Sequence, residues 1–326
     1  MKPIRWPVAA ISLGFFLLLI LPLLLGPDNS YVLYIASLIG IYALLCLGLN
    51  ITIGYIGLLD LGFMAFYAIG AYLAALLSIR GVSFWLILPI CALAGGLLRY
   101  LLGRPILKLR GDYLAIVTLA FGEITRLVAN NAVAITNGPK GLPRVGEKMS
   151  EVSLLGVVFN DTIHYYYLIL AMVAFTAVIS YRLEHSRMGR AFVAIREDEL
   201  AAELSGINVA RVKSVAFVIS GMFGALAGAI YVHWIGFVSP EMFTFWESVF
   251  LVAMIVVGGM GNLTGVGLGV VLLVGMPEVL RSTLGTQFVD FRMLVFGLVM
   301  VVVIIFRPQG LIPSRRRLLE LHTPKN

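Results

Sequence analysis

Charged residues are scarce in this sequence, and their scarcity excludes an ordinary soluble fold. Only 13% of the 326 residues are charged, 60% are hydrophobic, and the mean hydropathy is +0.98. Soluble domains average about 25% charged and about 45–50% apolar residues. A soluble protein of this length needs more polar residues to cover its surface. Lipid must therefore surround much of the exterior.

Patterns that hold metals or phosphates are also missing. Cys46 and Cys91 lie inside apolar runs, where a small packed hydrophobe is the simplest interpretation. The four histidines are scattered, and no His-x-x-x-His or Cys-x-x-Cys spacing offers a metal site. No Gly-x-x-x-x-Gly-Lys-Ser/Thr loop is present, so another chain would have to bind any ATP that drives this protein. We therefore expect neither a metal nor a cofactor in this chain.

Ten apolar runs approach the length of about 20 residues that a bilayer-crossing helix needs. They cover residues 8–25, 32–50, 58–78, 84–103, 113–131, 166–181, 213–233, 245–257, 263–280 and 290–306. The first run also resembles a signal peptide, but Leu25-Gly26-Pro27-Asp28 is a poor cleavage site, so residues 1–29 are interpreted as an anchor. The predicted fold is all-α: one polytopic membrane helical bundle, residues 1–326, of about ten transmembrane helices.

The basic residues lie between the apolar runs, which is how orientation in a membrane is encoded. The net charge of +7 therefore does not indicate nucleic acid, which would need a basic face on a soluble domain. With the N-terminus inside, the cytoplasmic segments hold 17 Lys and Arg, including four between 99 and 112, and the outer segments hold 6. This bias predicts that both termini are cytoplasmic, with residues 307–326 as a cytoplasmic tail.

Two glycine-rich segments, 50–62 and 257–269, break the pattern of plain spans. Dense glycine frees backbone groups, which membrane proteins tolerate where they face protein or a water-filled path. Interrupted helices near a translocation route are one interpretation, and a pair of tight turns with close helix packing is the other.

One span, 213–233, carries small residues at four-residue steps: Ala216, Ser220, Gly224 and Gly228. Small residues let helices approach closely in lipid, where no hydrophobic force drives them together. This face predicts close packing inside a bundle or at a subunit contact.

Polar groups inside spans are expensive, so they are candidates for function. Glu123 and Arg126 are three residues apart on one helix face and can pair, either as a structural brace or as part of a solute path. Asp60, beside the first glycine break, either lines the path or caps the following helix. The candidates for a translocation path are Asp60, Thr118, Gly122, Glu123, Arg126, Gly258, Gly259 and Gly261.

The cytoplasmic segment 182–212 predicts two short helices. The first runs over about 188–196, with Phe192 and Ile195 on one face. The second has Asp198 as its N-cap and Gly206 just past its end as a left-handed C-cap. A solvated charged loop is the usual meaning of such a run. Its capped, partly apolar character also suits docking into a groove on another protein.

Several motifs resemble the branched-chain amino acid permeases of ATP-binding-cassette importers. Ala201-Ala202-Glu203 with Gly206 is similar to the coupling loop of these importers, whose pattern is Glu-Ala-Ala followed by Gly. Further similar segments are Gly54–Gly62, Gly111–Glu123, Thr136–Leu142, Val257–Gly265 and Arg307–Ile312. The extra first span and the long outer loop 132–165 favour the larger, LivM-like, of two related permease subunits.

This resemblance implies a multi-pass protein of a bacterial-type plasma (inner) membrane that is not an enzyme. It also implies several partners: a second related permease, two cytosolic ATPase subunits and a soluble extracytoplasmic binding protein. The loop residues implied to couple to the ATPase are Arg196, Glu197, Asp198, Glu199, Ala201, Ala202, Glu203 and Gly206. The substrate would be a branched-chain or related amino acid, while relatives on the same scaffold move urea or short amides.

Two other classes compete with this interpretation. An ion-coupled secondary transporter could use the charged residues inside the spans, but it would not need the 182–212 segment. An intramembrane enzyme is disfavoured, because no span holds a Ser/His or paired-Asp arrangement and no His-Glu-x-x-His occurs. His233 beside Trp234 is most simply an interfacial anchor.

Overall fold

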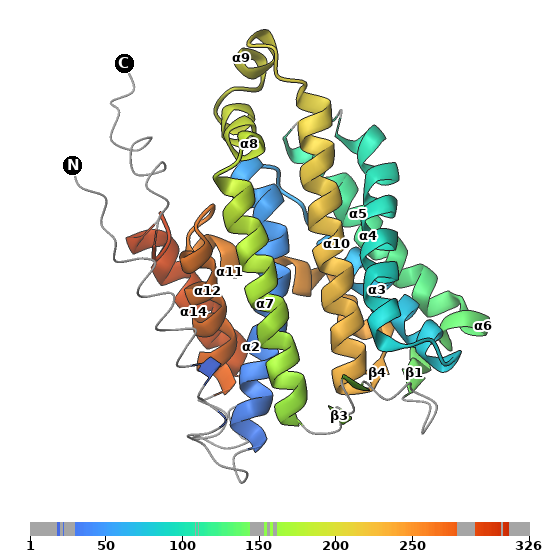
Figure 1. Cartoon of the computed structure of the whole chain (residues 1–326). Helices are drawn as coiled ribbons and strands as arrows, with labels where there is room; N and C mark the ends of the chain where they lie inside the picture. Colours follow the sequence, from blue (N-terminus) through green and yellow to red (C-terminus); the bar gives the residue numbers. More distant parts are fainter. Residues whose placement is uncertain are drawn as a thin grey trace.

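The chain forms a bundle of long helices (Figure 1). The computed structural model describes residues 30–143 except 108 and 110, residues 162–278, and residues 291–312 except 308, together with 18, 19, 22, 153, 154, 157 and 158. The bundle helices are α2 (Ser30–Asn50), α3 (Phe63–Ile79), α4 (Phe84–Ile106), α5 (Asp112–Asn131), α7 (Thr162–Glu184), α10 (Val209–Ile235), α11 (Phe245–Gly258), α12 (Leu263–Val270) and α14 (Phe291–Phe306). The prediction of an all-α membrane bundle is confirmed.

Shorter elements join these helices. Two π-helical turns, Ile51–Ile56 and Val271–Gly275, directly continue α2 and α12. At one end of the bundle lie α8 (Arg187–Glu197) and α9 (Glu199–Leu204). The remaining elements are α6 (Val133–Thr136), 3-10 turns at Gly138–Lys140 and Pro240–Phe243, and the short strands β1 (Leu142–Pro143), β2 (Ser153–Leu154), β3 (Val157–Val158) and β4 (Phe237–Val238). Two antiparallel pairs form, β1 with β4 and β2 with β3.

The predicted spans agree with the helices where the structure describes them. Among the described residues, five helices are long and apolar enough to cross a membrane: α2 with its π-helical turn, α4, α5, α7 and α10. Three apolar helices are shorter, Phe63–Ile79, Phe245–Gly258 and Leu263–Glu278. The first predicted span, 8–25, lies almost entirely outside the described residues. Ten crossings therefore stay a prediction.

Helix α10 is the most enclosed of the long helices and packs mainly against α3 and α4. The predicted small-residue face lies in this contact. A Cβ at Gly228 would lie 2.2 Å from the carbonyl oxygen of Tyr67, and Ala216 and Ser220 are fully buried. The backbones therefore touch directly, which is how helices gain contact where lipid offers no hydrophobic drive. The packing prediction for this span is confirmed.

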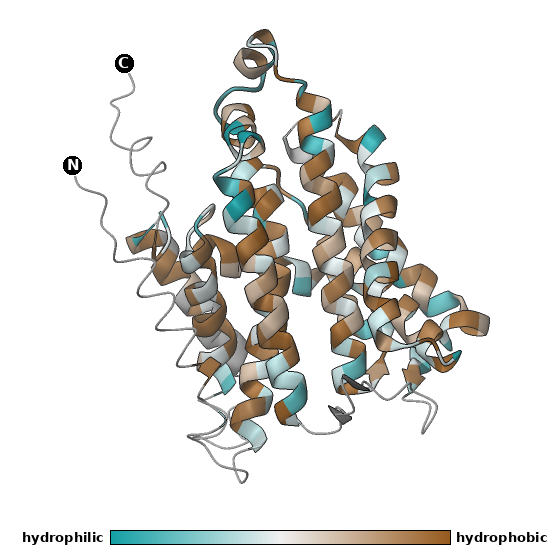
Figure 2. Ribbon diagram, in the orientation of Figure 1, coloured by the Kyte–Doolittle hydropathy of each residue, from teal (hydrophilic) through white to brown (hydrophobic). Residues whose placement is uncertain are grey.

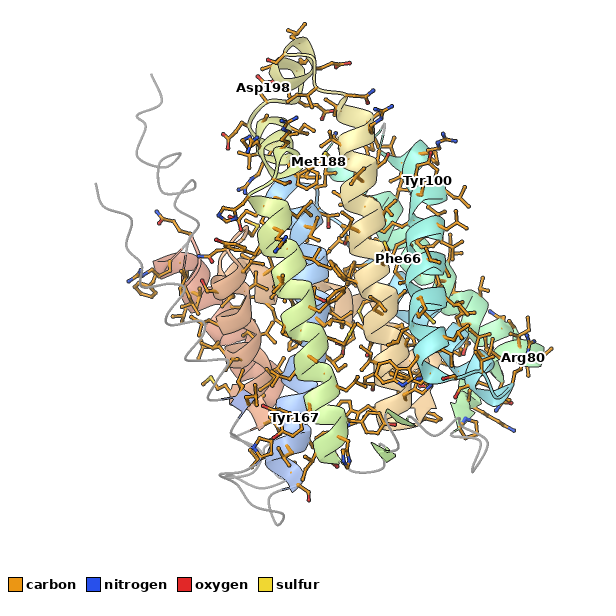
Figure 3. The ribbon with its side chains drawn as sticks, in the orientation of Figure 1. Phe66, Arg80, Tyr100, Tyr167, Met188 and Asp198 are labelled. Atoms are coloured by element: carbon orange, nitrogen blue, oxygen red, sulfur yellow. The ribbon has the colours of Figure 1, made fainter. Side chains whose placement is uncertain are left out.

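Hydrophilic residues gather mostly toward the two ends of the bundle, while the middle is largely hydrophobic (Figure 2). Met188 and Asp198 lie at one end, and Arg80 and Tyr167 lie toward the other (Figure 3). This separation agrees with the predicted assignment of the 182–212 segment and Arg80 to opposite sides of the membrane. Which side is cytoplasmic stays a prediction.

Helix α5 is the least enclosed of the five long helices. In its most hydrophobic stretch 22% of the residues are buried, against 67% in α10. Its exposed large side chains recur at helical spacing: Tyr113, Ile116, Ile124, Leu127 and Val128. One face of α5 is therefore open to lipid or to another protein.

Candidate functional site: coupling helices, helix breaks and buried charges

Helix α8 is bound into the bundle through its apolar face. Ser186 caps its N-terminus by accepting a hydrogen bond from the backbone N–H of Gly189 at 3.2 Å. Phe192 and Ile195, the predicted apolar face, are buried in the main core of the chain. This face is therefore already occupied by the chain's own helices and is not free for a partner.

Helix α9 has the predicted caps. The carboxylate of Asp198 accepts a hydrogen bond from the backbone N–H of Ala201 at 3.0 Å. Gly206 has φ +84°, and its N–H donates to the carbonyl of Glu203 at 2.9 Å, while the N–H of Ile207 donates to Ala202 at 3.1 Å. These bonds satisfy carbonyls that the end of a helix leaves without a partner.

The outer surface of α9 is exposed and partly apolar. Leu200 and Leu204 are one turn apart, with 57% and 87% of their surface exposed, and Glu203 is exposed beside them. Glu199 faces inward instead, where it accepts a hydrogen bond at 2.7 Å from Lys213, which is 3% exposed. This ion pair fixes α9 against the start of α10, so that the two leucines project from the bundle.

Both glycine-rich segments are breaks between helices. The π-helical turn that continues α2 ends at Ile56 and is followed by Gly57 with φ +80°, and α3 begins only at Phe63. The second break runs from Gly259 to Asn262, between α11 and α12. A Cβ at Gly258 would lie 2.2 Å from the carbonyl of Gly265, so α11 and α12 approach backbone to backbone. The interrupted helices and the close packing are therefore both present.

Two residues that follow α14 form hydrogen bonds to the end of α11, at the second break. The N–H groups of Leu311 and Ile312 donate to the carbonyls of Val257 and Gly258 at 2.8 and 3.0 Å. These carbonyls lie at the end of α11, where no intrahelical partner is available. Leu311 and Ile312, at the end of the sequence motif Arg307–Ile312, thus cap the end of α11.

Asp60 forms a buried ion pair that the sequence did not reveal. Its carboxylate pairs with Arg99 of α4, and the two side chains are 2% and 1% exposed. The guanidinium also lies over the rings of Phe63, Phe66 and Phe217. The N-cap of α3 is Gly62, without a side-chain cap, although Gly62 N–H does donate to Asp60 at 3.1 Å.

This pair corrects the sequence-based charge count, in which Arg99 belonged to a cytoplasmic loop. Arg99 instead lies inside the bundle, leaving 16 basic residues for the cytoplasmic segments against 6 outside, so the predicted orientation is unchanged. The sequence did offer a signal that Arg99 is buried, because this residue lies within the apolar run 84–103. A charge there needs a partner, because a lone buried charge is costly.

Thr118 and Gly122 face the same irregular segment as Asp60. The hydroxyl of Thr118 accepts a hydrogen bond from the N–H of Leu61 at 3.1 Å, and a Cβ at Gly122 would lie 3.4 Å from the Cα of Gly62. Asp60, Arg99 and Thr118 border a hollow of about 10 Å³, enough for about one water molecule. These predicted path residues are thus close together but do not enclose a solute-sized cavity.

Glu123 and Arg126 pair as predicted. Arg126 Nε donates to Glu123 Oε2 at 2.9 Å, and Arg126 Nη1 lies 3.7 Å from Glu241. Their side chains are 31% and 24% exposed, on the weakly enclosed helix α5. The eight predicted path residues therefore fall into three places: the α3–α5 contact, the middle of α5, and the second break.

Long apolar helices, two of which are interrupted, are the features of a protein embedded in a membrane. The family described as branched-chain amino acid transport system, permease component, matches residues 31–304. The chain belongs to this family.

Individual relatives agree. The high-affinity branched-chain amino acid transport system permease protein LivM of Escherichia coli K12 is 42% identical over 311 residues, covering 88% of this chain and 71% of LivM. The corresponding protein LivH of Escherichia coli K12 is 28% identical over 83% of this chain and 91% of its own length. A probable LivM of Methanocaldococcus jannaschii is 26% identical over 85% of this chain and 91% of that protein. No solved structure matches the chain significantly.

Proposed function

We propose that this chain is one permease subunit of an ATP-driven importer and forms part of the passage for branched-chain amino acids. The observation that carries the proposal is α9, a capped helix with an exposed apolar turn, held at the end of the bundle by its ion pair to α10. The 42% identity to a LivM permease supports this substrate class over urea or short amides.

The proposed partners follow from what the chain leaves exposed and what its relatives are. A second, related permease would cover α5, because one apolar face of this helix is exposed. That such a second permease exists is supported by the likeness of this chain to proteins named LivM and LivH. Two cytosolic ATPase subunits would receive α9 of this chain and its counterpart in the second permease. A soluble binding protein outside would deliver the amino acid, and the assembly would lie in the inner membrane with both termini cytoplasmic.

The docking surface for the ATPase is the outward turn of α9. Leu200 and Leu204 offer an apolar contact that water would otherwise cover, and Glu203 adds a charge at its edge. An amphipathic helix that lays its apolar side into a groove is a common mode of recognition. The eight residues of the coupling set thus differ in position. Arg196 and Glu197 end α8, and Asp198, Glu199, Ala202 and Gly206 shape α9. Ala201 and Glu203 lie on the exposed surface of α9.

Reversing the charge of Glu203 or replacing Gly206 with Val should uncouple ATP hydrolysis from uptake while the chain stays in the membrane. Gly206 has φ +84° with no atom near its Cβ position, so Val is opposed by backbone strain and not by crowding. ATPase co-purification and leucine uptake into vesicles measure the effect. Gly267→Ala, at a helical glycine also free of neighbours, is the control. Unchanged binding and uptake in both test variants would refute the docking surface.

Cysteine labelling should verify the orientation. A cysteine at Lys140, in the turn before β1, should react with an impermeant maleimide in intact cells. A cysteine at Leu204, which is 87% exposed, should react only after the cells are permeabilised. The native Cys46 and Cys91 are buried and contribute little background. Labelling of both positions from the same side would contradict the proposed topology.

A further inference from the structure

The side chain of Arg196 runs from the end of α8 into the bundle. Its aliphatic part covers Gly57, where an added Cβ would lie 3.0 Å from Arg196 Cγ. Its Nη1 donates to the carbonyl of Gly54 at 2.7 Å, and the same Nη1 lies 3.6 Å from the Cβ position of Gly261. One side chain therefore contacts both helix breaks, although it belongs to the predicted ATPase-coupling segment.

The carbonyl of Gly54 requires a hydrogen-bond donor from outside its own helix. It lies in the last turn of the helix that starts at Ser30, where the final carbonyls have no intrahelical partner. The helix macrodipole places partial negative charge at this end. A guanidinium donates a charge-assisted hydrogen bond there, which is stronger than one between neutral groups. Arg196 thus caps the C-terminal end of the helix formed by α2 and its π-helical turn.

Asn50 connects the first break to the second. Its side chain is fully buried, and its Oδ1 accepts a hydrogen bond from the N–H of Gly261 at 3.0 Å. A Cβ at Gly54 would lie 2.6 Å from that same nitrogen, so the two backbones are in contact. We call the set Asn50, Gly54, Arg196 and Gly261 the junction. Through the side chains of Asn50 and Arg196, it joins α2, α8 and the α11–α12 turn.

We infer that Arg196 is a positioning residue for transport, which transmits movement of α8 and α9 to the two helix breaks. The inference rests on the proposed function, since it needs an ATPase that displaces α9. Because Phe192 and Ile195 anchor α8 in the core, α8 moves together with the helices beneath it. The direct bond from Arg196 to Gly54 then moves the end of α2, and Asn50 moves the α11–α12 turn. Small shifts at packed interfaces are a recognised way to switch between two arrangements.

The test uses the complete importer in proteoliposomes: this chain, its partner permease, the ATPase subunits and binding protein loaded with leucine. Arg196→Gln removes the charged donor and retains a polar side chain. We expect normal ATPase co-purification and ATP hydrolysis within about twofold, but about tenfold less leucine transported per ATP, because a charged hydrogen bond is lost. Arg196→Lys, which keeps the cation but not the fork, should lie between Gln and the original residue.

Asn50→Leu tests the other half of the junction. It removes the acceptor for the Gly261 N–H and should also lower the ratio of transport to hydrolysis. If both residues act in one link, Asn50→Leu with Arg196→Gln should be no worse than the more severe single variant, whereas independent effects would add. Arg211→Gln, which removes an exposed arginine at the start of α10, is the control and should leave the ratio unchanged.

Each outcome decides between transmission and a purely structural role. A lower melting temperature of the complex with an unchanged transport-to-hydrolysis ratio in Arg196→Gln would overturn the inference. If Arg196→Gln fails to assemble, the ratio in Arg196→Lys decides: a reduced ratio supports transmission and an unchanged one overturns it. If the unaltered chain neither binds the ATPase subunits nor transports leucine with ATP, the proposed function itself has failed.

Discussion

Replacing Arg99 with Met while Asp60 stays should abolish the folded permease. The two side chains are 1% and 2% exposed, so the substitution leaves a carboxylate deep in the bundle without its cation. Breaking such a pair from one side costs about 3–5 kcal/mol, which is a large fraction of the about 5–15 kcal/mol by which proteins are typically stable. Asp60→Leu alone should fail similarly, because it leaves the guanidinium unpaired. Membrane yield and thermal unfolding in detergent measure the loss.

The double variant Asp60→Leu with Arg99→Met should recover most of the folded protein. Replacing a buried ion pair by apolar side chains of similar volume is often neutral or stabilising, since neither charge then has to leave water. Gly62 loses one hydrogen bond from its N–H to Asp60, so full recovery is not expected. Folded yields in both single variants equal to that of the unaltered chain would contradict the buried pair.

Neutralising Glu123 or Arg126 should leave the protein in the membrane but strongly reduce leucine uptake. These side chains are 31% and 24% exposed, and Arg126 keeps Glu241 within 3.7 Å when Glu123 becomes Gln. Neither single substitution therefore leaves a fully buried charge without a partner. In the proposed passage beside a second permease, the pair would replace hydration lost by the ammonium and carboxylate of the amino acid. Loss of one charged hydrogen bond to the solute predicts about a tenfold or greater fall in uptake.

The double variant Glu123→Gln with Arg126→Gln separates solute contact from a structural brace. A brace should lose membrane yield in each single variant and recover it in the double, as at Asp60 and Arg99. A pair that contacts the solute should keep its yield throughout and lose leucine uptake in the singles and the double alike. Uptake assays normalised to protein in the membrane distinguish the cases. Full uptake in the double variant would end the solute-contact hypothesis.

The coupling segment shows how far local sequence signals reach. Asp198, Gly206 and the two short helices were predictable, because caps act through neighbouring backbone groups and need no knowledge of the rest of the fold. The same signals could not reveal that the apolar face of α8 packs against the core of the chain. Nor could they reveal that the leucines of α9 are exposed. An amphipathic face shows that something will cover it, but not what.

The two ion pairs show which contacts between charged residues can be predicted from the sequence and which cannot. The pairing of Glu123 with Arg126 followed from their three-residue spacing on one helix. The pairing of Arg99 on α4 with Asp60 in the first helix break joins residues 39 positions apart, and no local spacing encodes it. Counting Arg99 as a loop charge was therefore wrong, although its place inside an apolar run signalled the need for a buried partner.

Composition, the length of the apolar runs and motifs that are continuous along the chain indicate a lipid-embedded, all-α protein and its family. The contacts across the bundle, which are Asp60 with Arg99, Asn50 with Gly261 and Arg196 with Gly54, became visible in the three-dimensional fold. They could not be predicted from the chain, because lipid provides no hydrophobic force that selects helix partners. Close packing of small residues and a few long-range polar contacts select them instead.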